Sequence, residues 1–533
     1  MSGHKGAGHA IGFLWCVILA IGLFISTTAD ASAEDSMSVP PPFVMALYMH
    51  CYVLGAQNPS DPRVRNPTAL DNLQNWPPIA EESEWFNASD AAMAASGASA
   101  TKNDFEKAET AGVNAFTMLL GPHMLPSSAY SNALNLLASV AQHQKVKLIP
   151  GVWTDWWDGQ DYKLFGQHVK AFLDAHPGAF QSRDGKPMFA LEFDNLSKHL
   201  SSSDQALLSA RVQEFLAPWG GLAGTYTIMY VPWDVKQGLE VPLLAKANAL
   251  SIWTPQDDWS ALHSHIVVDL ANSLHKKVAW PVSPSFYQRR AGGGPMEYGN
   301  GFGVAKYIDA WLKVLDVRPE FVDIQTWNDF SEGTAIRPTN ATDETLLDLT
   351  KYLHQWVERG SQPPITMEQL MLFHPKQLVK ASLDDPTALV TNAAWRHKTP
   401  TVDYLDLVTF LKEDAVVRVT LGKAQWQETV PAGFHEWIIY APQPTSPQRP
   451  GEVIAGPDSY PAKTPMRSVT LAQPFSEGTP QVQVERRGRV LPLTSKAPYL
   501  ARGQFQDFTV IGDTVSWITD LPSTKLVIPG LRP

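Results

Sequence analysis

The chain of 533 residues is poor in cysteine and contains only Cys16 and Cys51. Cys16 lies in an N-terminal apolar segment that we expect to be removed, so the mature protein would keep one cysteine and no intrachain disulfide. Its stability must then come from a hydrophobic core, which a chain of this length is able to bury.

Long hydrophobic runs are also scarce. The longest extends from Ile11 to Ile25, follows the basic Lys5 and precedes Ala31-Ser32-Ala33. This order of features is typical of a secretory signal peptide, and the run is short of the roughly 20 residues that a membrane span needs. We therefore expect cleavage after Ala33 and a secreted or periplasmic protein without a membrane anchor.

Positive charge is in deficit, because 42 Lys and Arg face 53 Asp and Glu, for a net charge of -11. This balance argues against nucleic acid or an anionic membrane as partner and favours a neutral ligand. The histidines are scattered without metal-ligand spacing, and no Gly-x-Ser-x-Gly run indicates a serine hydrolase. We expect no metal and no cofactor. The sequence does not predict an oligomeric state.

What the chain does contain is an alternation of apolar strands and amphipathic helices. The candidate strands cover 43–49, 113–120, 147–153, 187–193, 225–231, 249–254, 277–283 and 321–327. The candidate helices cover 104–111, 130–144, 162–176, 203–216, 259–275 and 304–315. Eight such units predict a closed (β/α)8 barrel with a parallel sheet. An open doubly wound sheet is the competing fold, although no glycine-rich phosphate loop follows the first strand.

Two details of the barrel region can be predicted. The first helix is expected to begin after Asn103, which would form a capping box with Glu106, and to end at Gly112. The polar, proline-rich stretch 57–99 before it is expected to be a long loop over the barrel mouth.

The pattern changes after Trp356, where a linker rich in Gly and Pro is followed by short alternating runs. The runs at 415–421, 436–440, 481–485 and 507–511 predict a β-sandwich-like domain, with a long loop or seam at 441–465. The expected division is a signal peptide at 1–33, the barrel at 37–360, a linker at 361–369 and the accessory domain at 370–533.

The accessory domain carries four tryptophans whose exposure would indicate its role. They are Trp395, Trp426, Trp437 and Trp517. Exposed rings would favour polysaccharide binding, and buried rings would favour a structural role.

Barrel enzymes carry their chemistry where the strands end, so those residues are the candidates for a site. Here they are rich in carboxylates and aromatic rings and poor in cations. They include Trp153, Asp155, Glu192, Trp233 and Tyr287. Such a mouth suits a carbohydrate, which is bound by ring stacking and by hydrogen bonds to its hydroxyls.

The eighth strand ends in the run Trp327-Asn328-Asp329-Phe-Ser-Glu332, which places two carboxylates three residues apart. Cleavage of a glycosidic bond needs one carboxyl to protonate the leaving oxygen and another to activate water or attack the sugar. The alternative is structural: Asp329 would cap the following turn, and Glu332 would pair with a surface cation.

Four strand ends carry longer sequence runs, which are more specific than single residues as motifs of a protein family. They are Leu148-Ile-Pro-Gly, Phe189-Ala-Leu-Glu192-Phe, Pro281-Val-Ser-Pro-Ser-Phe-Tyr287 and the segment from Pro319 to Glu332. Over the whole barrel region the chain thereby resembles glycoside hydrolase family 71, the α-1,3-glucanases often called mutanases, which also tend to carry a C-terminal β-domain. The resemblance implies an inverting, endo-acting enzyme with Asp329 and Glu332 as its catalytic pair. We assign Glu332 as general acid and Asp329 as general base, with the reverse order open.

The resemblance implies further substrate contacts. Glu192 corresponds to a glutamate that the family carries on its fourth strand and would bind substrate hydroxyls. The alternative is that Glu192 is a buried acid paired with another residue within the barrel. Asp155 would match a strand-three aspartate, whereas a direct register places Trp153 there. Trp327 is expected to stack on a sugar or wall the pocket and Asn328 to hold a hydroxyl, unless both pack beneath the catalytic pair.

His50 is a shifted counterpart of the family's Ala-His and a candidate substrate contact, with a core histidine as the alternative; His123 is equally ambiguous. The run Asn328 to Thr334 also resembles the Asn-Glu-x-x-Glu-Gly-Thr segment of family 99 endo-α-mannosidases. Asp329 favours family 71, and Gly333-Thr334 leans towards family 99. A secreted carbohydrate-binding protein without activity is the remaining alternative.

Overall fold

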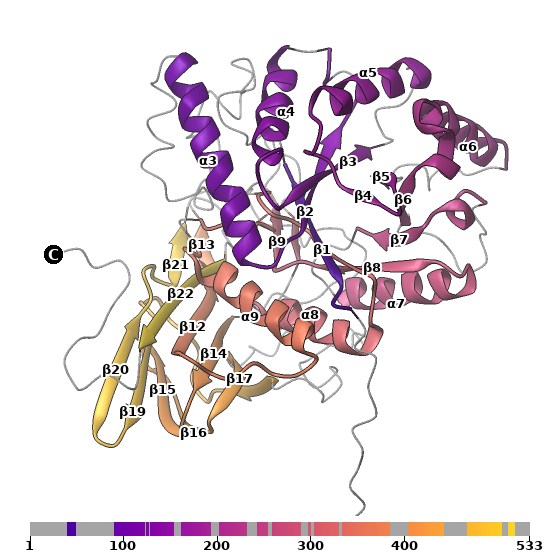
Figure 1. Cartoon of the computed structure of the whole chain (residues 1–533). Coiled ribbons are helices and arrows are strands. Elements are labelled where there is room, and N and C mark those ends of the chain that lie inside the picture. Colours follow the sequence, from indigo (N-terminus) through magenta and orange to yellow (C-terminus); the bar gives the residue numbers. More distant parts are fainter. Residues whose placement is uncertain are drawn as a thin grey trace, which may run out of the picture. The chain divides into compact units, whose positions relative to one another are not determined.

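Eight parallel strands form a closed barrel (Figure 1). They are β1 (Phe43–Tyr48), β2 (Ala115–Leu120), β3 (Lys147–Trp153), β5 (Lys186–Glu192), β6 (Tyr226–Val231), β7 (Ala249–Ile252), β8 (Lys277–Val282) and β11 (Phe321–Ile324). Each pairs with the next along the barrel, and the β1–β11 pair completes the ring. The predicted barrel is confirmed, although the eighth strand ends at Ile324 and not at residue 327.

The computed structural model describes residues 40–49, 90–122, 124–126, 128–153, 161–192, 202–231, 242–253, 258–288, 297–299, 303–329, 333–339, 341–383, 403–441, 466–503 and 510–517. The predicted signal peptide therefore lies outside the described residues. Within them, none of the helices has the length and apolarity needed to cross a bilayer.

Seven α-helices are seen in the described ranges: α3 (Asp90–Thr110), α4 (Ser128–Ala141), α5 (Tyr162–Ala175), α6 (Ser202–Leu216), α7 (Asp258–Ser273), α8 (Ala305–Val317) and α9 (Thr345–Arg359). Their apolar faces share one core with the outward faces of the strands, as Phe105, Leu137 and Phe215 do with Val44 and Phe116. This is the two-layer packing that an α/β barrel requires.

The predicted start of the first helix is wrong. Helix α3 begins at Asp90, so the expected capping box at Asn103 lies inside a helix, and residues 90–99 are not part of a loop. The segment before Asn103 is rich in alanine, the best helix former, and it extends the helix toward its N-terminus. Helix α9, which was not predicted, ends at the left-handed Gly360 (φ +66°).

The barrel interior is apolar in its middle and polar at the carboxyl end of the strands, and an ion pair lies at the amino-terminal end. At the amino-terminal end of the strands, the Arg183 guanidinium lies 4.9 Å from the centre of the Phe321 ring and forms an ion pair with Glu320. Apolar residues such as Met45 and Ile228 fill the middle. The polar Glu192, Tyr230 and Ser251 stand in register at the carboxyl end, where barrel enzymes carry their chemistry.

The C-terminal region consists of β-sheets. One has the order β18 (Met466–Thr470), β17 (Gly433–Tyr440), β14 (Tyr404–Leu411), β12 (Glu368–Pro375), β22 (Val510–Trp517), and a second has the order β16 (Ala424–Val430), β15 (Ala415–Leu421), β19 (Gln481–Arg486), β20 (Arg489–Thr494). Strands β13 (Gln377–Leu383) and β21 (Leu500–Gly503) form a parallel pair. The two larger sheets share one buried core, as in a β-sandwich.

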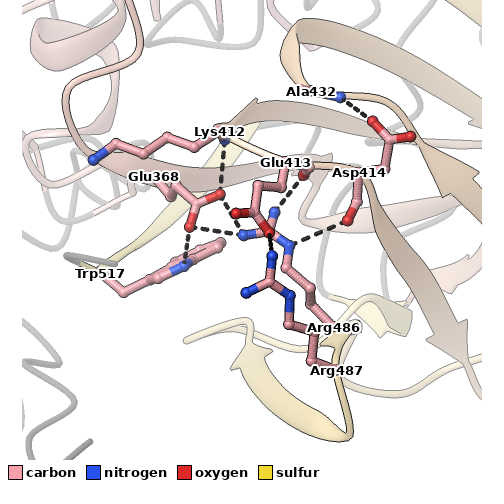
Figure 2. A network of polar contacts seen from close by, with 8 residues as sticks. All are labelled: Glu368, Lys412, Glu413, Asp414, Ala432, Arg486, Arg487 and Trp517. Carbon is pink, nitrogen blue, oxygen red and sulfur yellow. Dashed lines mark hydrogen bonds and ion pairs between the residues drawn. The ribbon is translucent and has the colours of Figure 1, made fainter. Parts of the chain in front are cut away.

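The tryptophans of this region are mainly structural. Trp426 and Trp437 are buried in the core between the sheets, with ring centres 5.0 Å apart. Trp517 is half-buried and donates to Glu368 (Figure 2), and Trp395 lies outside the described residues. The structural role that we linked to buried rings is therefore favoured.

The other face of the five-stranded sheet packs on the barrel's last helix. The Tyr352 ring of α9 stacks on Phe434 with centres 5.3 Å apart, and Trp356 meets the same ring edge to face. Barrel helices and sheet thus share one buried cluster. The domain boundaries at residues 360 and 370 stay predictions.

Candidate active site

The chain turns back on itself directly after β11. Gln325 N–H still donates to Val282 of β8, but Thr326 N–H donates to Thr334 O at 3.1 Å and Ile336 N–H returns to Thr326 O at 3.2 Å. The segment 326–337, here called the catalytic loop for the role that the sequence predicts for Asp329, is therefore closed by backbone hydrogen bonds between its two limbs. Asp329 lies on this loop at the mouth of the barrel, and Glu332 lies outside the described residues.

Two threonines fix the backbone of Asp329. Its N–H donates to Thr326 Oγ1 at 2.8 Å, and its carbonyl accepts from Thr334 N–H at 3.3 Å. The two hydroxyls are themselves 3.0 Å apart and hydrogen-bonded. Asp329 is 4% exposed, and a carboxyl on a residue so largely removed from water is a candidate for acid or base chemistry.

The Gly333-Thr334 pair has a local structural role. Gly333 adopts a left-handed φ of +63°, which favours glycine, and its carbonyl accepts from the Ser285 hydroxyl. Thr334 closes the loop as described above. The pair that leaned towards family 99 in the sequence is thus explained by loop closure, without reference to the sugar.

Asn328 and Trp327 belong to this loop, and their side chains are buried. The Asn328 side chain accepts from Met49 N–H at 2.7 Å and donates to Met49 O at 3.2 Å, so both of its polar atoms hold the end of β1. Trp327 is fully buried and packs on Phe116, with ring centres 5.2 Å apart. Because both side chains are occupied in the core, the structure favours the packing alternative over the expected sugar contacts.

A polar cluster that the sequence did not predict lies inside the barrel. Asp323 Oδ2 accepts from Tyr230 OH at 2.8 Å, from Ser251 Oγ at 3.1 Å and from Gln325 Nε2 at 2.9 Å. Burial raises the pKa of Asp323 to about 6. Burial, and then the charges of Asp323 and Glu192, raise the pKa of Tyr230 well above its ordinary value. A signal was available, since Asp323 interrupts an otherwise apolar strand.

The remaining predicted residues are placed only in part. Glu192 is buried at the end of β5, in register with Tyr230 and with Trp153, the last residue of β3. Tyr287 lies on the short strand β9 (Phe286–Gln288), opposite Tyr298 of β10 (Glu297–Gly299). His50, His123, Asp155 and Trp233 lie outside the described residues. Within the described ranges, no three potential metal ligands gather.

The sequence model of glycosyl hydrolase family 71 matches residues 91–444, which include most of the barrel, the described part of the catalytic loop and the first strands of the C-terminal sheets. The chain belongs to glycosyl hydrolase family 71. It is therefore a glycoside hydrolase, and the resemblance noted from its strand ends is confirmed.

Two curated relatives of this family 71 enzyme come from Schizosaccharomyces pombe. An ascus wall endo-1,3-alpha-glucanase is 27% identical over 165 residues, 30% of this chain and 34% of the relative. The glucan endo-1,3-alpha-glucosidase agn1 is 24% identical over 365 residues, 63% of this chain and 80% of the relative. The chain thus spans about a third of the first relative's length.

Among solved structures, a family 99 endo-alpha-mannosidase from Bacteroides thetaiotaomicron is 15% identical. The match covers 60% of this chain and 98% of that one, with a TM-score of 0.42. A likeness of this degree says nothing about the substrate of the family 71 enzyme.

Proposed function

We propose that this family 71 enzyme is an endo-acting α-1,3-glucanase that hydrolyses an α-glucan. The family match carries the proposal, because its range includes Asp329 and the ends of seven of the eight barrel strands. The names of the two S. pombe relatives support the same substrate. The burial and double backbone anchoring of Asp329 support a catalytic role for its carboxyl.

In the proposed mechanism, Asp329 is the general base and Glu332 the general acid. Asp329 takes a proton from a water molecule, whose oxygen attacks the anomeric carbon on the face opposite the leaving oxygen. Glu332 donates its proton to that oxygen as the glycosidic bond breaks. Inversion requires the carboxyls to lie about 6.5–9.5 Å apart, so that the water fits between base and sugar. The two roles can be exchanged without changing the stereochemical outcome.

The polysaccharide would be held by aromatic and polar residues at the strand ends. We assign substrate contacts to Trp153, Asp155, Glu192, Tyr287, Trp233 and His50, which the sequence places at the mouth. The negative net charge of the chain is compatible with a neutral glucan and unfavourable for a nucleic acid. Because residues 1–33 have the features of a signal peptide, we propose that the enzyme acts outside the cytoplasm.

The test is incubation of the purified protein with insoluble α-1,3-glucan and, separately, with an α-mannan oligosaccharide. Reducing ends and product configuration are followed by proton NMR. We expect β-anomeric glucooligosaccharides from the glucan only. An α-anomeric product would show that the enzyme retains the configuration at the anomeric carbon and does not invert it. Cleavage of the mannoside alone would favour a family 99 type of activity, and glucan binding without turnover would favour a binding protein.

A further inference from the structure

We propose that Asp323 is a positioning residue of the active site, which fixes the Gln325 side chain and, through Gln325 and Thr326, the catalytic loop that carries Asp329. The inference rests on the role proposed for Asp329. It concerns a residue that touches no substrate, since Asp323 is fully buried inside the barrel.

Among the described residues, only one of the two carboxylate oxygens of Asp323 forms hydrogen bonds. Donors from β6, β7 and the end of β11 converge on Oδ2, and such convergence stabilises the charged carboxylate. Oδ1 is buried and has no hydrogen-bond partner among the described residues. A buried polar atom without a partner destabilises a fold, and an apolar side chain would fill this space at lower cost. The presence of an aspartate at this position is therefore better explained by the side chain that it fixes than by a gain in stability.

Asp323 holds the side chain of Gln325. The amide Nε2 donates to Asp323 Oδ2 and to Ile252 O, both at 2.9 Å. The backbone N–H of Gln325 donates to Val282 O at 2.8 Å. Gln325 is thus anchored to β7, β8 and β11 at once, immediately before the chain leaves the barrel wall.

One residue connects this anchor to Asp329. Thr326 follows Gln325, accepts from Asp329 N–H at 2.8 Å and donates its own N–H to Thr334. A displacement of Gln325 therefore reaches Asp329 through the backbone and the hydroxyl of a single residue, Thr326. Catalysis is sensitive to such a displacement, because a misplacement of about 1 Å can cost about 100-fold in rate.

Asp323 also contributes charge beneath the mouth. The titratable groups that face it are Tyr230 on β6 and, next to Tyr230, Glu192 on β5. Its register neighbours on β1 and β8 are Met45 and Pro281, which carry no charge. A nearby carboxylate raises the pKa of a group that acts as acid. Its removal should move the alkaline limb of the pH–rate profile to lower pH.

The experiment compares three variants with the wild type. Asp323→Leu removes the acceptor, Asp323→Asn keeps an acceptor but removes the charge, and Gln325→Leu removes the anchored amide and leaves Asp323 in place. Asp513→Asn is the matched control, because Asp513 is a buried aspartate of the C-terminal sheets that is bonded to Ser495 and Lys496.

Two readouts are made on each protein: hydrogen exchange of peptides that cover 325–337, and kcat and KM on soluble α-1,3-glucooligosaccharides as a function of pH. For Asp323→Leu and Gln325→Leu we expect exchange about tenfold faster and kcat about 10 to 100-fold lower, with KM changed less than about threefold. Asp323→Asn should recover most of kcat and keep the shifted alkaline limb. The Asp513→Asn control should resemble the wild type in both readouts.

Wild-type kcat and exchange in Asp323→Leu and Gln325→Leu would overturn the proposal. If Asp323→Leu does not fold, Gln325→Leu decides alone. If the wild type does not hydrolyse the glucan, the proposed function fails, and hydrogen exchange, which needs no substrate, still decides whether Asp323 fixes the catalytic loop.

Discussion

Asp329 combines a carboxyl suited to acid or base chemistry with a backbone that Thr326 and Thr334 hold in place. The motif in the sequence predicted the residue, but not the means by which it is fixed. The two threonines belong to a closed loop whose hydrogen bonds join residues on opposite limbs. The two threonines hold Asp329 because closure of the loop brings them next to it.

Replacement of either member of the proposed catalytic pair should abolish most turnover. We expect Asp329→Asn and Glu332→Gln each to lower kcat by about 100 to 10,000-fold, because general acid or base assistance is worth that much. Both variants should melt within a few degrees of the wild type. The exposed Asp174→Asn, which loses only a surface ion pair with Lys170, is the control. Near-normal activity of both catalytic variants would remove them from the mechanism.

Asn328 should matter for stability more than for sugar binding. Asn328→Ala leaves the N–H and C=O of Met49 without their partners, and we expect a loss of about 1–3 kcal/mol in the free energy of unfolding, measured by urea titration. Asn135→Ala, which breaks an exposed contact with His176, should cost less. A raised KM with unchanged stability would restore the sugar contact expected from the sequence.

The strands and most helices of the barrel were predictable because local periodicity encodes them. Strand β3 and the helix beginning at Tyr162 begin where the apolar pattern places them. Helix α3 was mispredicted because Asn103 and Glu106 form a locally plausible cap, whereas the alanine-rich residues before them continue the helix. The helix propensity of the whole alanine-rich segment therefore decided where the helix begins, and the four-residue capping motif did not.

The two sheets of the C-terminal region are joined by a buried acid (Figure 2). Glu368 of β12 is fully buried and accepts from Lys412 N–H and Trp517 Nε1, each at 2.8 Å. It also forms an ion pair with Arg486 of β19 at 2.8 Å, and Arg486 in turn donates to the carbonyls of Glu413 and Asp414. This network connects the five-stranded sheet to the four-stranded one.

Breaking this network should destabilise the C-terminal sheets strongly. For Glu368→Ala we expect a loss of about 3–5 kcal/mol in the free energy of unfolding, because the partner charge and the indole N–H stay behind unpaired. The neighbouring Arg487→Ala removes an exposed ion pair with Glu413 and should cost at most about 1 kcal/mol. Equal losses in the two variants, measured by chemical denaturation, would contradict the role of Glu368.

Barrel and sheet meet at a pair of buried carboxyls. Asp406 Oδ2 accepts from Val304 N–H at 2.7 Å, just before α8, and the left-handed Gly303 (φ +70°) lies so close that a Cβ there would come within 2.4 Å of Oδ2. Glu436 is buried on the neighbouring strand β17 close to Asp406, and Asp309 adds a further negative charge. Burial raises the pKa of Asp406 to about 8, and burial together with Asp406 raises that of Glu436 well above its ordinary value.

This pair should make the whole molecule more stable in acid. In the unfolded chain both carboxyls titrate near pH 4, whereas in the folded protein they keep protons to a higher pH. The folded state therefore binds more protons, and its stability falls as the pH rises from about 4 to about 8. We expect the melting temperature to fall across this range and Glu436→Gln to flatten the fall. The partly exposed Glu428→Gln is the control, and a wild-type slope in Glu436→Gln would contradict the assignment.

The sequence by itself determined the eight strand and helix units, the β-rich C-terminal region and the Trp-Asn-Asp-x-x-Glu run of a glycoside hydrolase, because periodicity and short motifs are written along neighbouring residues. Only the tertiary structure decided that Asn328 holds Met49, 279 residues away, and that Tyr230 meets Asp323, 93 residues away. Closure of the barrel brings these residues together. No local pattern specifies which side chains will face each other across a ring of eight strands, and their contacts decide which polar residues support the site and which only pack.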